Sequence, residues 1–139
     1  DCGVDIQHPV MDGVLTRADA LVMVTSAIPD GAEGAAKQID WLAHHPQYRH
    51  VLSRVVLVIN HIRPPSGRRD RKASDALVAT LVERFGQIIP EDRIVVVPYD
   101  RHIAEAGVID LDELNPVTAR RFLELAATLA TGFPTAETP

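Results

Sequence analysis

The chain of 139 residues has little that would tie it to a membrane or an oxidising compartment. It contains a single cysteine, Cys2, and so cannot form an internal disulfide, which fits a reducing compartment. None of its apolar runs approaches the roughly 20 residues of a membrane-spanning helix. No signal-peptide pattern is present. We therefore expect a cytoplasmic protein without a membrane helix.

Several kinds of chemistry also lack their motifs. No Gly-x-x-x-x-Gly-Lys-[Ser/Thr] loop occurs, so the backbone cradle and the lysine that hold nucleotide phosphates are missing. The six histidines have no cysteine cluster at zinc-like spacing, and no Gly-x-Ser-x-Gly nucleophile motif is present. The net charge of −5 gives no basic field, so we do not expect nucleic-acid binding.

What the chain does have is three apolar, β-branched runs, at residues 20–25, 54–59 and 93–97. None of them alternates with polar residues. Continuous Val/Ile/Leu runs of this length are typical of strands buried on both faces, as in a parallel sheet covered by helices. We predict three parallel strands that are adjacent in chain order.

Helical patterns alternate with these runs. The predicted helices are a short one near 9–18, one from an Asp30 cap to about His44, one from a Ser74 cap to Gly86, and one from an Asn115 cap, with Pro116 in its first turn, to Gly132. Alternation of helices and strands predicts a three-layer α/β/α fold. Residues 1–132 are expected to form the domain, with a basic loop at 64–73, and residues 133–139 a disordered tail.

An ordered set of short segments resembles the ParA/MinD-type ATPases, P-loop proteins with a deviant Walker A motif. The segments are Asp1-Cys2-Gly3, Arg17-Ala18-Asp19, Val58-Ile59-Asn60, Val97-Pro98-Tyr99-Asp100, and Gly107–Asp110 followed by Asn115-Pro116. The set covers nearly the whole chain, although no single segment is decisive. The most similar group is the MinD-like ATPases associated with type VII (ESX) secretion, the EspI-like proteins. The resemblance implies the C-terminal half of a P-loop NTPase-like domain that lacks the P-loop strand.

The resemblance also implies roles for individual residues. Asp1 resembles the Walker B aspartate that organises water on Mg²⁺, which makes it the candidate catalytic and metal-associated residue. Asn60 resembles the asparagine that reads the adenine edge, and Pro98, Tyr99 and Asp100 resemble the segment that borders the adenine with backbone groups. The intact protein would bind ATP and Mg²⁺ and couple nucleotide-dependent dimerisation to partner recruitment in secretion, partition or positioning. This chain alone would not be catalytic.

Plainer interpretations stay open beside these. The residues named above also suit a solvated chain end and ordinary turns after strands. The basic residues Arg63, Arg68, Arg69, Arg71 and Lys72 are more simply a solvated loop than a partner surface. The alternative for the whole chain is a non-catalytic α/β interaction module of a secretion complex. The resemblance implies a further strand beside the strand at 21–25, which this chain lacks, so we expect either self-association through that edge or an edge covered by the chain's own N-terminal residues, besides protein partners.

Overall fold

The sheet at the centre of the fold consists of three parallel strands. A computed structural model describes residues 5–131 of the chain. Strands β1 (Leu21–Ser26), β2 (Val55–Asn60) and β3 (Ile94–Val97) pair in parallel in the order β1-β2-β3. The predicted strands, their direction and their order are therefore confirmed.

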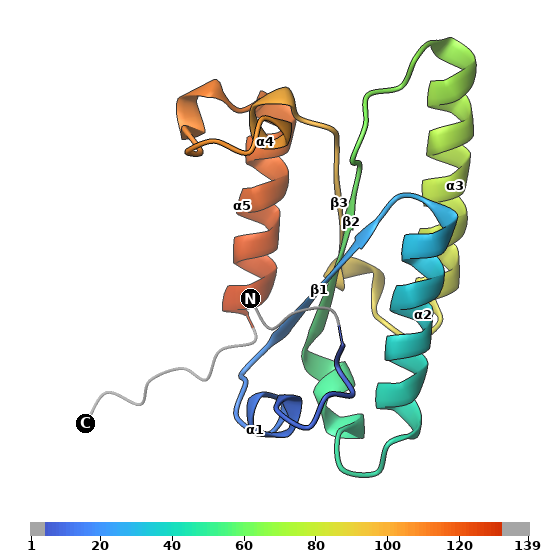
Figure 1. The fold of residues 1–139 in the computed structure, drawn as a ribbon, viewed down its shortest axis with the longest axis vertical. Helices are drawn as coiled ribbons and strands as arrows, with labels where there is room; N and C mark the ends of the chain where they lie inside the picture. Colours follow the sequence, from blue (N-terminus) through green and yellow to red (C-terminus); the bar gives the residue numbers. More distant parts are fainter. Residues whose placement is uncertain (1–4, 132–139) are drawn as a thin grey trace.

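Helices cover both faces of this sheet (Figure 1). The long helices are α2 (Pro29–His44) and α3 (Arg68–Gly86) on one face and α5 (Pro116–Ala130) on the other. The short elements are α1 (Met11–Leu15), α4 (Arg101–Ala104) and the 3-10 turns η1 (Arg49–Arg54), η2 (Glu91–Arg93) and η3 (Leu111–Glu113). The predicted three-layer α/β/α arrangement is confirmed.

The two faces of the sheet have separate hydrophobic cores. Towards α2 and α3, buried residues such as Leu57, Ile39 and Phe85 form the larger cluster. Towards α5, four buried valines of β2 and β3 pack against Leu125 and Leu129. Val55 to Ile59 are all buried, because β2 is the central strand and both of its faces are covered. This double covering explains the unbroken apolar run in the sequence.

β1 is an edge strand that keeps part of its apolar surface exposed. Helix α5 packs on β3 and β2, so Val22 and Val24, which point to that face beside Val56 and Val58, are 39% and 65% exposed. Within residues 5–131, the outer edge of β1 has no backbone hydrogen-bond partner; β1 pairs with β2 alone. An open, uncharged edge of this kind is unusual in native sheets, which generally cover or charge their edges.

Two predicted helix starts are wrong. Helix α2 has Ile28 rather than Asp30 at its N-cap, because Pro29 already occupies the first turn, where proline is favourable. Helix α3 begins at Arg68 rather than at Ser74, so residues 68–73 of the predicted basic loop belong to its first two turns. The N–H and Oγ of Ser66 donate to Asp70 at 2.7 and 3.2 Å and stabilise this early start.

The start of α5 agrees with the sequence. Asn115 is its N-cap, and its side chain accepts a hydrogen bond from the N–H of Val117 at 3.0 Å, with Pro116 in the first turn. The predicted helix end at Gly132 and the predicted disordered tail lie outside the described residues.

Candidate functional site

The carboxyl ends of the strands bring most of the candidate residues to one edge of the sheet. Asn60 is in register with Ser26 of β1 and Val97 of β3, so Pro98 and Tyr99 follow directly beside it. The backbone ladder continues past the strands, since the N–H of Ala27 donates to the carbonyl of Asn60 at 2.9 Å. Loops at this edge of an open α/β sheet are the usual place for ligands.

The side chain of Asn60 is free to bind. It is half-buried, and within residues 5–131 its amide makes no hydrogen bond. An amide carries both a donor and an acceptor, so it can pair with a group that presents the complementary pair. The neighbouring residue is also held in place, because the N–H of His61 donates to the carbonyl of Val97 at 3.0 Å.

The side chain of Asp100, by contrast, is committed to the fold. Its buried carboxylate accepts a hydrogen bond at 2.9 Å from the N–H of His102, so Asp100 is the N-cap of α4. The same carboxylate accepts a second hydrogen bond at 2.9 Å from the N–H of Asn115. The backbone of Pro98 and Tyr99, both half-buried, is thereby held at the sheet edge.

The charge of Asp100 is stabilised by the same contacts. Burial alone raises the pKa of this carboxyl, but the N–H of Asn115, the hydroxyl of Thr118 and the N–H groups of His102 and Ile103 outweigh it, so the pKa lies below its usual value. The Thr118 hydroxyl favours the charged form of the Asp100 carboxylate, although the two groups do not form a hydrogen bond of normal geometry.

A second feature at this edge is a hollow beside Tyr99 whose charges are paired internally. Arg101 Nε lies 2.8 Å from Glu105 Oε1. Nε2 of His102 accepts from the N–H of Asp110 at 2.8 Å, so Nδ1 carries the ring proton and faces Glu113 at 3.3 Å. This surface therefore offers few free charges to a ligand.

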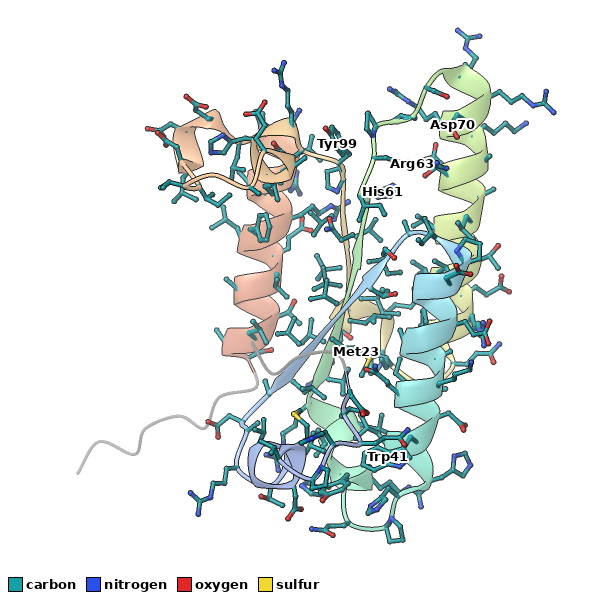
Figure 2. The ribbon with its side chains drawn as sticks, viewed as in Figure 1. Met23, Trp41, His61, Arg63, Asp70 and Tyr99 are labelled. Carbon is teal, nitrogen blue, oxygen red and sulfur yellow. The ribbon has the colours of Figure 1, made fainter. Side chains whose placement is uncertain are left out.

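A third feature, which the sequence did not predict, is a pocket of about 160 Å³ between the first turn of α2, residues 61–65 and the first half of α3. His61 lines it with its Nδ1 3.3 Å from Oγ of Ser74. Figure 2 shows His61, Arg63 and Asp70 at the carboxyl end of the sheet, near the start of α3. Only a helix that starts at Arg68 brings Asp70 and Ser74 to the same wall, which is why the predicted boundary concealed the pocket.

The candidate catalytic and metal-associated residue, Asp1, lies outside the described residues. Within residues 5–131, no group of three or more His, Cys, Asp or Glu side chains could hold a metal ion. No helix in this part of the chain is long and apolar enough to cross a membrane.

Comparison with known proteins finds the same relative in two strains. Over 133 residues, 96% of the chain, the sequence is 40% identical to the ESX-1 secretion-associated protein EspI of Mycobacterium tuberculosis, in the strains CDC 1551 / Oshkosh and ATCC 25618 / H37Rv. The chain is similar to part of EspI. It spans about a fifth of the length of these relatives, since the match covers 19% of each. No protein-family model matches the chain, and no solved structure matches it. The expected similarity to EspI-like proteins is confirmed at this level.

Proposed function

We propose that this chain is the C-terminal part of a ParA/MinD-like ATPase domain, and that the intact protein binds ATP and Mg²⁺ and acts in ESX-1 secretion. The similarity to a protein named as ESX-1 secretion-associated supports the proposed role in ESX-1 secretion. The structural observation that carries the nucleotide part is the free, half-buried amide of Asn60 beside the Pro98-Tyr99 segment. In such a protein, nucleotide-dependent dimerisation would be coupled to the recruitment of protein partners in the cytoplasm.

The proposed recognition of the base follows from the donor and acceptor pattern at the sheet edge. The Asn60 amide offers one acceptor and two donor hydrogens, which suits an adenine edge with its exocyclic amine and ring nitrogen. Pro98 and Tyr99 supply backbone groups directly after the next strand, β3, and Asp100 contributes by fixing that segment with its buried carboxylate. A guanine edge reverses this pattern, so the Asn60 amide meets it only after a half-turn, and the backbone groups of the Pro98-Tyr99 segment, which cannot turn, are left unpaired, which costs binding.

The phosphates and the metal ion would depend on residues beyond this site. Asp1 is the residue of this chain that would orient water around Mg²⁺, and the bound ion would screen the phosphate charge. The phosphate cradle would have to come from a Gly-Lys loop elsewhere in the longer protein, because this sequence contains none. The open edge of β1 is where a further strand of that protein, or of a second copy, would pair.

The proposal is tested in the longer protein that contains this region. Asn60→Ala should weaken ATP binding and reduce the preference for ATP over GTP, by about tenfold in affinity if one well-placed hydrogen-bonded pair is lost. Gln87→Ala removes an exposed amide just past the C-terminal end of α3, whereas the start of α3 lies near this edge of the sheet, and it is the matched control. Unchanged ATP affinity and unchanged ATP/GTP preference in Asn60→Ala would exclude the base-reading role.

A non-catalytic interaction module is the second candidate, and one observation favours it. The segment that leads from α4 into α5 exposes large apolar side chains, among them Val108 at 92% and Leu111 at 75%. Exposed apolar residues that cluster in one segment are typical of protein-binding surfaces. If the longer protein binds no nucleotide at all, this candidate replaces the first.

A further inference from the structure

The pocket beside His61 combines apolar walls with an arginine, Arg63, that forms no close ion pair in the described part of the chain. Its polar lining consists of His61, Arg63, Asp70 and Ser74, and the remaining lining is Ala, Ile, Pro and Leu side chains. Within residues 5–131, the guanidinium of Arg63 makes no ion pair with a carboxylate inside 4 Å and no hydrogen bond. The planar fork of such an arginine is well suited to two parallel hydrogen bonds to a carboxylate.

The other polar groups of the pocket complete a donor set. When the hydroxyl of Ser74 donates to Nδ1 of His61, the ring proton is on Nε2, and the imidazole is a further donor. Asp70 is the only acid in the lining, and one of its oxygens is already occupied by Ser66, whose N–H and Oγ both donate to it. These hydrogen bonds, and then the charge of Arg63, hold the pKa of Asp70 below its usual value.

The size and walls of the pocket restrict what can fill it. A volume of about 160 Å³ is far smaller than the 300–1,000 Å³ or so of a typical small-molecule site, so only a small group can enter. Ile28, Ile62 and Leu77 are among its apolar walls, so the occupant should have an apolar part next to its charge. The charge of Asp70 in the same lining favours a single negative charge over the double charge of a phosphate.

We propose that this pocket binds a carboxylate of a partner protein, carried either by a chain terminus or by an acidic side chain, with Arg63 as the charged anchor and His61 as a second donor. The pocket lies on the side of the sheet edge that faces α2 and α3, whereas the nucleotide proposal concerns Asn60 and the Pro98 segment. The carboxylate proposal can therefore be tested independently of the nucleotide proposal. The basic first turn of α3, with Arg68, Arg69, Arg71 and Lys72, would add long-range attraction for an acidic partner.

The test is an NMR titration of the 139-residue chain with four probes at equal ionic strength. The probes are acetyl-alanyl-valine with a free carboxylate, the same peptide as its C-terminal amide, an acetylated and amidated Ala-Glu-Ala peptide, and inorganic phosphate. We expect saturable shifts of the His61, Ile62 and Ser74 signals with at least one carboxylate peptide and none with the amide. The first and third peptides distinguish a chain terminus from an acidic side chain.

Two variants complete the test. Arg63→Gln should weaken binding of the carboxylate peptide by about tenfold, since a charge-assisted hydrogen-bonded pair is lost. Arg68→Gln removes another exposed arginine, outside the pocket lining, and should leave binding within about twofold, because it contributes only screened attraction. Equal binding of acid and amide, tighter binding of phosphate, or no saturable shift with either carboxylate peptide would each overturn the proposal.

Discussion

The N–H of Asn115 donates to Oδ2 of Asp100 at 2.9 Å, and through this bond one buried carboxylate joins the starts of α4 and α5. The two residues are fifteen positions apart in the chain. We expect Asp100→Ala to lower the free energy of unfolding by about 2–3 kcal/mol, because the change removes a helix cap and leaves buried N–H groups unpaired. Urea denaturation measures the loss. Asp75→Ala, which removes an exposed carboxylate on α3, should change stability by less than about 0.5 kcal/mol.

The same carboxylate should give a stability that depends on pH. Its pKa is lower in the folded chain than in the unfolded one, so its contribution is complete above the unfolded value of about 3.9 and is lost as the pH falls through the folded pKa. Asp100→Asn has nearly the same shape but no charge. The stability difference between the natural chain and this variant should therefore be largest near pH 6 and shrink below about pH 4. A stability difference that stays constant over this pH range would show that the charge of Asp100 does not contribute to the free energy of unfolding.

Two glycines of α2 should respond oppositely to alanine. A methyl group at Gly34 meets nothing within 4 Å, so Gly34→Ala should stabilise the chain by about 0.5–1 kcal/mol through lower entropy of the unfolded state. A methyl group at Gly31 would collide with Oγ of Ser26, with the backbone N and O of Ser26 at 3.2 Å. Gly31→Ala should therefore be less stable than Gly34→Ala by at least about 1 kcal/mol.

A background substitution separates the two causes of that difference. Ser26→Ala removes the hydroxyl that the new methyl group would meet, so part of the penalty of Gly31→Ala should disappear in that background. Thermal unfolding of the four variants is sufficient. If Gly31→Ala were as favourable as Gly34→Ala in the natural background, the close approach of α2 to the end of β1 would be refuted.

The parts of the fold that depend on local pattern could be predicted from the sequence. The run at 54–59 indicated a doubly covered strand because every residue from Val55 to Ile59 is apolar, and all five are buried. The Asn115-Pro116 pair fixed the start of α5, because the cap and the proline act within one turn. In both cases, the physical cause lies within a few residues of its effect.

The parts that depend on contacts between distant segments could not be predicted. The apolar pattern of the sequence did not predict the start of α3, because the first turn of this helix is exposed and charged. The contact that stabilises it is polar, a hydrogen bond from Ser66 to Asp70. The pocket beside His61 needs both that early turn and the first turn of α2. The double role of Asp100 becomes visible only when α4 and α5 are placed side by side, since Pro-Tyr-Asp after a strand also suits an ordinary turn.

The open edge of β1 should make the chain self-associate. Val22 and Val24 are exposed on one face, and the outer backbone groups of the strand are unpaired within the described residues. We expect sedimentation to show a dimer or larger species at micromolar concentration. Val24→Lys should shift this species to the monomer, because an edge lysine opposes strand pairing, whereas Ala79→Lys on the exposed side of α3 should not. A chain that stays monomeric at high micromolar concentration would contradict pairing through β1.

The chain on its own should not bind ATP tightly, even if the longer protein does. It contains no phosphate-binding loop, so only the base could be contacted, through Asn60 and the Pro98-Tyr99 backbone. A few such hydrogen bonds contribute about 0.5–1.5 kcal/mol each, whereas association costs at least about 4 kcal/mol in lost freedom of motion. Titration calorimetry with ATP and Mg²⁺ should therefore detect no binding in the micromolar range and no hydrolysis should follow. Micromolar affinity for this chain would mean that residues other than a Gly-Lys loop hold the phosphates, and the assignment of this region as half of a ParA/MinD-like domain would then have to be abandoned.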